Sequence, residues 1–146
     1  MSNNQHSDLT QAAIEARRQA YAPYSQFAVG AALLTASGEI ISGANVENAS
    51  YGMTICAERT AIFSAVSRGL REYTAIAVAT PGGHSPCGAC RQVLAEFAPD
   101  LLILLVDSNH PDQAPRQLRL SELLPHSFQF SGPAAGGDSV ADRPTD

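Results

Sequence analysis

The sequence predicts an α/β fold, a three-layer α/β/α sandwich built on a mixed sheet. Helical and strand-like patterns alternate along most of the chain, and two adjacent strand patterns are joined by a short turn. Further on, strands are separated by helices. A hairpin gives antiparallel pairing and a strand–helix–strand unit gives parallel pairing, so we expect both kinds in one sheet with helices on both faces.

The N-terminal part is predicted to form a helix and then a hairpin. Leucine and alanine recur at helical spacing over about residues 8–21, after the capable N-caps Ser7 and Asp8. Pro23 ends this helix. Two apolar, β-prone stretches follow, and the pair Ser37-Gly38 suits the turn between them. These strands are residues 27–36 and 39–44.

The second half of the chain alternates between helix and strand. From Thr54 the apolar residues return to helical spacing until Gly69, a good residue for the position after a helix. A β-rich run over residues 73–80 precedes a helix that opens near Pro86-Cys87 and stops before Pro99. The remaining elements are a buried-type strand, residues 101–106, and a short helical turn, residues 121–124.

Composition indicates one domain over residues 1–130. Of the 146 residues, 45% are hydrophobic and 16% charged, which is typical of a globular chain. Residues 131–146 contain almost nothing to bury and are predicted to be a disordered tail. The longest apolar run, residues 101–106, is far shorter than the roughly 20 residues of a membrane span. The first ten residues lack an apolar signal core, so we expect a cytoplasmic protein without a membrane partner.

Net charge argues against a nucleic-acid partner. Nine Lys and Arg residues against fourteen Asp and Glu residues give a formal charge of −5. The field of such a molecule repels phosphate backbones. A polynucleotide substrate is therefore disfavoured.

Three cysteines are placed to bind a metal ion. Cys56 begins one predicted helix, whereas Cys87 and Cys90 lie three residues apart at the start of another. Residues i and i+3 share a helix face, and the partial positive charge at a helix N-terminus favours thiolates. The pattern predicts a zinc site of Cys56, Cys87 and Cys90, with a redox pair and a structural zinc knot as the alternatives.

Three protein ligands leave one zinc position open, which is typical of catalytic sites. Bound zinc lowers the pKa of water from about 15.7 to about 7. Glu58, two residues after Cys56, is predicted to shuttle the proton of this water without binding the metal. Arg59 is predicted to offset the charge of the thiolates, and its alternative is a solvated helix charge. His84 is the alternative that would close the site as a fourth ligand.

With four segments the sequence resembles the small homotetrameric, zinc-dependent cytidine deaminases over about residues 8–130. These segments are Tyr24 to Leu33, Asn45 to Gly52, Cys56 to Arg59 and Pro86 to Gln92. The resemblance implies a cytidine deaminase-like catalytic domain over residues 1–130, one Zn²⁺ per chain and a tetramer. It also implies hydrolytic deamination of cytidine and 2′-deoxycytidine to uridine and 2′-deoxyuridine, with release of ammonia, in pyrimidine salvage.

The same resemblance implies how the substrate is bound. Phe27 would pack against the pyrimidine, Asn45 and Glu47 would hydrogen-bond the ribose hydroxyls, and the backbone of Ala57 would contact the base. Neighbouring subunits would contribute Ala49, Tyr51 and Phe128. The alternatives are ordinary packing for the aromatic residues and local loop hydrogen bonds for Asn45 and Glu47. The Gly82-Gly83-His84 stretch departs from the family pattern.

Two other functions remain open at this stage. A deaminase of another cytosine-bearing compound, such as a nucleoside antibiotic, would share the zinc ligands but not necessarily the ribose contacts. A non-enzymatic, zinc-stabilised binding module would have a closed coordination shell and would release no ammonia. A polynucleotide editor is opposed by the net charge.

Overall fold

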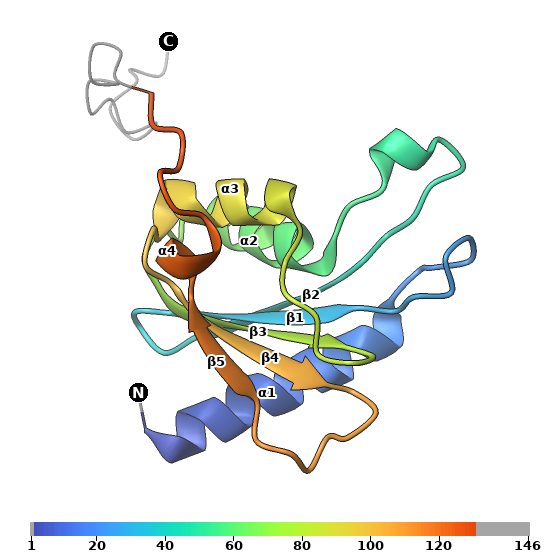
Figure 1. Ribbon diagram of the computed structural model, residues 1–146, viewed down its shortest axis with the longest axis horizontal. Helices are drawn as coiled ribbons and strands as arrows, with labels where there is room; N and C mark the ends of the chain where they lie inside the picture. The colour runs from blue at the N-terminus through green and yellow to red at the C-terminus, as the bar shows by residue number, and fades with distance from the viewer. Residues whose placement is uncertain (1, 131–146) are drawn as a thin grey trace, which may run out of the picture.

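A five-stranded sheet forms the centre of the molecule in this computed structural model, which describes residues 2–130 (Figure 1). Its order is β2-β1-β3-β4-β5. The β3–β4 pair is parallel and the other three pairs are antiparallel, so the sheet is mixed as predicted. The strands are β1 (Gly30–Thr35), β2 (Ile40–Ala44), β3 (Tyr73–Thr80), β4 (Leu102–Asp107) and β5 (Arg116–Arg119).

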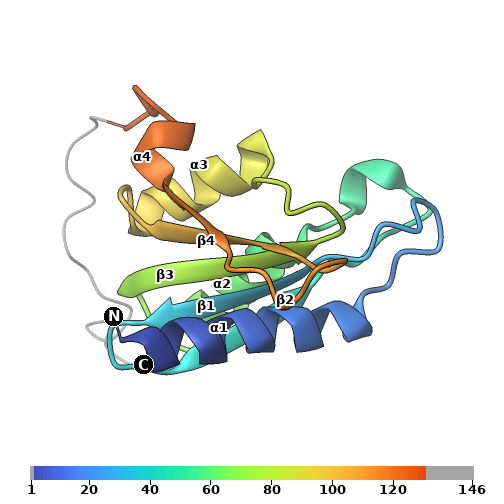
Figure 2. The same ribbon diagram turned by 60° about the horizontal axis from the view of Figure 1, so that its bottom comes forward.

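Helices cover both faces of the sheet (Figure 2). The helix α1 lies alone on one face, whereas α2, α3 and α4 lie on the other, which confirms the three-layer sandwich (Figures 1 and 2). None of the helices within residues 2–130 combines the length and the apolar character that crossing a bilayer requires. The helices are α1 (Asn3–Ala16), α2 (Ala57–Ser67), α3 (Gly88–Phe97) and α4 (Leu120–Leu123), with 3₁₀ turns η1 (Arg17–Gln19) and η2 (Tyr51–Met53).

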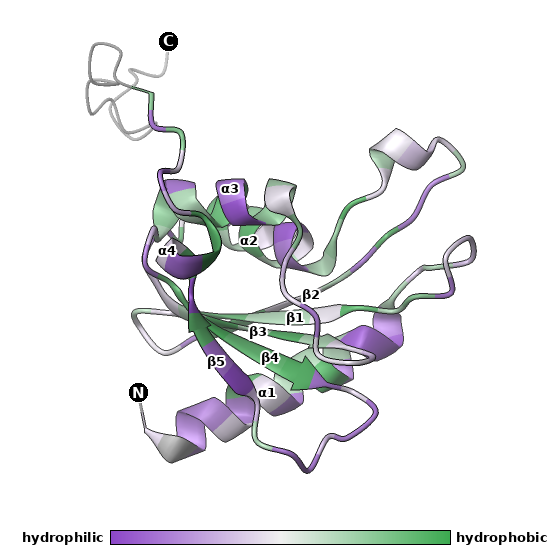
Figure 3. Cartoon of the chain, viewed as in Figure 1, coloured by the Kyte–Doolittle hydropathy of each residue, from purple (hydrophilic) through white to green (hydrophobic). Residues whose placement is uncertain are grey.

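The apolar core is divided in two by the sheet, because successive side chains of a strand point to opposite faces. In β1, Ala31 and Leu33 pack in the cluster beneath α2 and α3, whereas Ala32 and Leu34 pack in the cluster beneath α1. In Figure 3 the strands β3 and β4 have the colour of hydrophobic residues, the helices on either side carry both colours, and β5 at the edge is hydrophilic. The central strands therefore have almost no polar side chains, as expected for a sheet covered on both sides.

Gly43 allows α2 to lie directly on β2. A Cβ atom at this position would lie 2.5 Å from the backbone nitrogen of Ala61 and 2.6 Å from the carbonyl oxygen of Ala57. Any larger residue would push the helix away from the sheet. This close contact fixes the first turn of α2, which carries Glu58.

The start of α1 differs from the prediction. The helix begins at Asn3 instead of near residue 8, and its N-cap is Ser2. The backbone N–H of Gln5 donates to Ser2 Oγ, and the N–H of Ser2 donates to Gln5 Oε1, which is a capping box. The first turn contains no apolar residue of the helical pattern, so periodicity missed it. The helix also ends earlier, at Ala16, and continues as η1.

The strand β5 was not predicted. Of its four residues, Arg116, Gln117 and Arg119 are polar and exposed, only Leu118 packs against the core, and β4 pairs with the strand at the edge of the sheet. Alternating apolar residues, the main sign of a strand, are therefore missing here. The other elements agree within three residues, although β1 begins at Gly30 and α2 at Ala57. The predicted tail, residues 131–146, lies outside the described residues.

Candidate metal centre and active site

The three cysteines meet at the N-termini of two neighbouring helices. Cys56 is the N-cap of α2, Cys87 is the N-cap of α3, and Cys90 lies in the first turn of α3. Their sulfur atoms all lie within 4.8 Å of one another, and the Cys56 and Cys87 sulfurs are 3.8 Å apart. Two sulfurs bound tetrahedrally to zinc at about 2.3 Å lie roughly 3.8 Å from each other. The donor set therefore fits a zinc ion.

The charges around the sulfurs favour one thiolate strongly. A hydrogen bond with Cys90 and the neighbouring Arg59 guanidinium lower the pKa of Cys56 to about 5. The same hydrogen bond and burial raise the pKa of Cys90. Without a cation, three crowded sulfurs resist ionising together, so a dication is what allows all of them to become thiolates.

Glu58 is buried beside the sulfurs but is not one of the ligand group. The residue is only 5% exposed, and burial raises its pKa to about 7. A carboxyl group with this pKa is able both to accept and to donate a proton at neutral pH. These are the properties that a proton shuttle needs.

One cavity joins the metal-binding sulfurs to the predicted substrate residues. Its volume of about 290 Å³ is close to the lower limit of the volumes that are typical of small-molecule sites. Ala57 is fully buried and Cys90 lies behind the cavity in the core. The lining residues are Ser25, Phe27, Val29, Asn45, Glu47, Thr54, Cys56, Glu58, Thr80, His84, Ser85 and Cys87.

Asn45 fixes the segment that carries Phe27. Its Oδ1 accepts a hydrogen bond from the backbone N–H of Val29 at 2.8 Å, and its Nδ2 donates to the carbonyl oxygen of Phe27 at 2.9 Å. An amide group has two N–H bonds, so one remains for another acceptor. The local loop hydrogen bonds that were the alternative for Asn45 are thus present. They still leave one N–H of its amide for a ligand.

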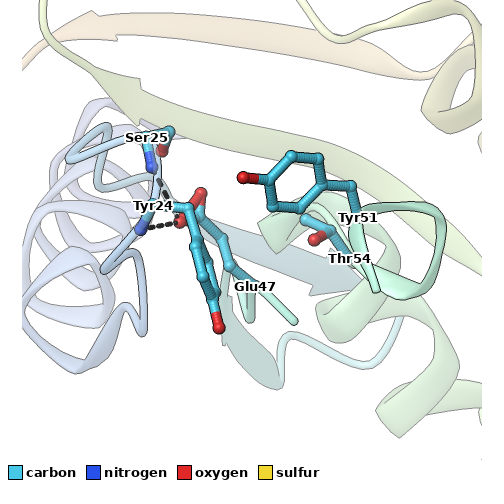
Figure 4. Close-up of a pocket in the computed structure, with 5 residues that line it drawn as sticks. All are labelled: Tyr24, Ser25, Glu47, Tyr51 and Thr54. Carbon is cyan, nitrogen blue, oxygen red and sulfur yellow. Dashed lines mark hydrogen bonds between the residues drawn. The ribbon is translucent and has the colours of Figure 1, made fainter. Parts of the chain in front are cut away.

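Glu47 anchors the same loop at its other end (Figure 4). Its Oε1 accepts from the backbone N–H groups of Tyr24 and Ser25, at 2.9 and 3.0 Å. Hydrogen bonds from Ser25, first through its side chain, lower the pKa of Glu47, so the carboxylate is charged. A second cavity of about 360 Å³ lies beside this carboxylate, and Tyr51 and Thr54 face it from the η2 side (Figure 4).

His84 lines the cavity without joining the sulfurs. Its ring centroid lies 6.2 Å from that of Phe27. The turn that brings it there contains Gly82 and Gly83 at φ values of 87° and 63°, which glycine adopts without strain. Within residues 2–130 the only group of three or more close metal-binding atoms consists of the cysteine sulfurs, and His84 is outside it.

A comparison with protein families identifies the family to which this site belongs. The model of the cytidine and deoxycytidylate deaminase zinc-binding region matches residues 3–106, which include the cysteines, Glu58 and the cavity. The chain belongs to the cytidine and deoxycytidylate deaminase family. Zinc is accordingly the metal of the three sulfurs, as the sequence predicted.

Individual members of the family are similar over most of the chain. A cytidine deaminase from Halalkalibacterium halodurans is 53% identical over 123 residues, which are 82% of this chain and 91% of that protein. The crystal structure of a cytidine deaminase from Burkholderia pseudomallei matches with a TM-score of 0.79 and 47% identity, covering 88% of this chain and all of that one. A blasticidin-S deaminase from Bacillus cereus is 41% identical over 87 residues, 53% of this chain and 62% of that protein.

Two of the predicted site residues are exposed aromatics outside the zinc-bearing cavity. Tyr51 is 74% exposed and its ring lies 5.6 Å from that of Tyr24 in the second cavity. Phe128 is 73% exposed, and its carbonyl oxygen accepts a hydrogen bond from Gln92. Ala49 is also exposed. All three are exposed, and none of them lines the cavity that contains the cysteine sulfurs.

Sequence reasoning missed several lining residues that carry small polar groups. Ser25 lies within a segment that resembles the family, but no role was assigned to it. Thr54 and Ser85 lie two residues before the N-cap cysteines Cys56 and Cys87. Their position in the sequence was the available signal. A residue just before a metal ligand at the start of a helix is expected to lie at the mouth of the site.

Proposed function

We propose that this chain hydrolyses cytidine and 2′-deoxycytidine to uridine and 2′-deoxyuridine with release of ammonia. The observation that carries the proposal is the single cavity that contains Glu58, two of the sulfurs and the pair Asn45 and Glu47. The family supports it, and so does the similarity to proteins named cytidine deaminase.

Binding of the nucleoside would use groups that remain free in the cavity. The pyrimidine ring is held against Phe27, which is 38% exposed and faces the cavity. The second oxygen of Glu47 and the free N–H of Asn45 bond the sugar hydroxyls, one accepting and the other donating. The backbone of Ala57, at the N-terminus of α2, contacts the base. A neutral sugar suits this wall, because the charged Glu47 repels a nearby phosphate.

Glu58 transfers the protons in the proposed reaction. Zinc held by Cys56, Cys87 and Cys90 supplies a Lewis acid that makes water a nucleophile at neutral pH. A carboxylate oxygen of Glu58 takes a proton from the attacking water and delivers it to the ring nitrogen beside the reacting carbon. The same carboxylate then takes the second proton, from the hydroxyl now on that carbon, and gives it to the departing amino group, which leaves as ammonia. Arg59 donates to the Cys56 sulfur and so withdraws charge from the ligand set.

We further propose that the protein is a homotetramer with shared sites, acting in cytoplasmic pyrimidine salvage. Thiolate ligands persist in that reducing compartment. Exposed aromatic side chains such as Tyr51 and Phe128 are the kind of residue that subunit interfaces cover. Ala49, Tyr51 and Phe128 would complete the site of a neighbouring subunit.

A second candidate is a deaminase of a cytosine-bearing antibiotic. The similarity to a blasticidin-S deaminase favours it, although that match covers only 53% of this chain. The two functions share the zinc site and differ at the sugar. Comparing kcat/KM for cytidine with kcat/KM for blasticidin S separates them.

The test of the proposed function is a spectroscopic assay of cytidine loss by the purified, zinc-loaded protein. Uridine and ammonia should form in equal amounts, a chelator should stop the reaction, and added zinc should restore it. A folded protein with one zinc per chain that converts neither cytidine nor 2′-deoxycytidine would contradict the proposal.

A further inference from the structure

Each of the three guanidinium nitrogens of Arg91, in α3, donates to an acceptor, and the acceptors belong to two separate segments. Its Nε donates to the carbonyl oxygen of Pro86 at 2.7 Å, and its Nη2 donates to Ser85 Oγ at 3.0 Å. Its Nη1 donates to the carbonyl oxygen of Leu123 at 2.8 Å. The arginines in the ion pairs of residues 2–130 are others, Arg68 and Arg119. Arg91 is thus a connector of backbone segments.

Two of these acceptors immediately precede a zinc ligand. Ser85 and Pro86 form the end of the connection from β3 to α3, and Cys87 follows them as the N-cap of the helix. The backbone N–H of Arg91 also donates to the carbonyl oxygen of Cys87, at 3.0 Å. Arg91 therefore contacts the two residues before Cys87 through its side chain and Cys87 itself through its backbone. Because the guanidinium group is planar and rigid, the side-chain contacts leave this turn little freedom to move.

The third acceptor belongs to the C-terminal part of the described chain. Leu123 is the last residue of α4, where helix carbonyls have no partner within the helix. The next residue of α3, Gln92, donates to the carbonyl oxygen of Phe128 at 3.3 Å. Two consecutive residues of α3 thus tie residues 123–128 to the helix that carries Cys90.

We propose that Arg91 is a positioning residue that locks the Cys87 turn against the end of α4 and thereby slows the loss of zinc. It differs from Arg59, which contacts a ligand sulfur, because the bonds of Arg91 all go to the backbone and to one hydroxyl next to the ligand. Groups that orient metal ligands in this way contribute to metal affinity without touching the ion. The inference rests on the zinc site of the proposed function.

The test measures the rate at which zinc passes from the folded protein to a chromogenic chelator, with no substrate present. Arg91→Gln should release zinc about 10–100-fold faster than the parent protein. Arg71→Gln is the matched control. Arg71 also donates to two carbonyl oxygens, those of Val66 and Leu70, but it lies after the end of α2 and lines neither cavity of the site. It should release zinc at the parental rate.

Milder variants keep the test decisive if Arg91→Gln does not fold. Ser85→Ala removes one acceptor, and Arg91→Lys keeps the charge but cannot reach three acceptors at once. Both should release zinc faster than the parent and more slowly than Arg91→Gln, at a temperature where circular dichroism shows all proteins folded. Parental release by these variants, or equal acceleration in Arg71→Gln, overturns the proposal. Failure of this proposal and failure of the proposed function can be distinguished. The first would be seen in the rate of zinc release, and the second in the absence of ammonia formation by the zinc-loaded protein.

Discussion

Arg59 donates a hydrogen bond to the sulfur of Cys56, one helical turn before it, at a nitrogen–sulfur distance of 3.5 Å. Both residues lie at the N-terminus of α2, where the helix dipole also favours negative charge. Arg59 is one of the causes that lower the pKa of Cys56, after the larger contribution of Cys90. The guanidinium thus prepares a thiolate before any metal binds.

Replacing Arg59 by Gln should raise the pKa of Cys56 in the metal-free protein. Less thiolate would then be present at pH 6, so alkylation of Cys56 by iodoacetamide should slow at that pH. Mass spectrometry that resolves the three cysteines measures the rate as a function of pH. Arg68→Gln, which removes the exposed ion pair with Glu39, is the control and should leave the profile unchanged. An identical profile in Arg59→Gln would show that this guanidinium does not act on the thiol.

Glu58→Gln should keep the fold and the zinc while losing the proton shuttle. The amide fills nearly the same volume but cannot accept a proton, so kcat for cytidine should fall by at least about 10²–10⁴-fold. Steady-state kinetics together with zinc analysis of the same sample measure both properties. Near-normal turnover with full zinc occupancy would remove Glu58 from the mechanism.

The same substitution should change how stability depends on pH in the metal-free protein. Burial raises the pKa of Glu58 from 4.5 to about 7. Between these values the unfolded chain ionises while the folded protein stays protonated, so the free energy of unfolding falls as pH rises and levels off above 7. The total is about 3 kcal/mol. Urea unfolding at pH 4.5 and pH 8 should show this loss in the parent protein relative to Glu58→Gln, and equal pH slopes in both would count against a raised pKa.

The elements that bury apolar residues were predictable from the sequence, and those that do not were missed. The strand β3 was predicted with its exact bounds, because nearly every residue in it is buried. The strand β5 has one apolar residue, Leu118, among polar, exposed ones, and it exists because β4 offers it backbone partners, which no local pattern reveals. The first turn of α1 depends on one capping box, Ser2 with Gln5, and not on periodicity.

The metal centre was predictable because its chemistry is concentrated in short motifs. Cysteine at the N-cap of two helices is a local feature, and the fold only has to bring the helices together. The anchoring of the loop by Asn45 and Glu47 joins segments about 20 residues apart, so the sequence left two interpretations open for them. Arg91 was hidden for the same reason, since one of its acceptors lies 32 residues away.

Glu47→Gln separates the two tasks of this side chain. The amide oxygen can still accept from the backbone N–H groups of Tyr24 and Ser25, so the loop and the thermal midpoint should be preserved. The loss of a charged acceptor for the sugar should lower kcat/KM for cytidine by about 10–100-fold while zinc stays bound. Glu47→Ala, which removes the anchor as well, should also lower the thermal midpoint. An unchanged kcat/KM in Glu47→Gln would remove the residue from the substrate site.

His84→Ala should leave one zinc per chain and a working enzyme, because His84 lies outside the sulfur group. Cys90→Ala, by contrast, should lose zinc, since three ligands are the minimum that hold the ion here. Metal analysis after dialysis compares the two proteins directly. Loss of zinc from His84→Ala would favour a closed, structural site.

The shared-site proposal makes a prediction for Phe128. Its ring is 73% exposed and lines neither cavity of the zinc site in its own chain. A nucleoside that reacts by proton transfer needs a site from which water is excluded, because water weakens each electrostatic contact. An aromatic ring from another subunit is a means to cover the open side of the cavity.

Phe128→Ala should therefore raise KM for cytidine by about 10-fold, the loss of one aromatic contact, in an assembly of unchanged size. Phe130→Ala is the matched control, because Phe130 is a neighbouring phenylalanine that is even more exposed and has no assigned role. Mixing Phe128→Ala with Glu58→Gln after dissociation should restore turnover, since hybrid sites combine an intact Glu58 from one chain with an intact Phe128 from another. Light scattering that shows a fully active monomer, or mixtures no more active than their parts, would refute shared sites and leave Phe128 as a surface residue.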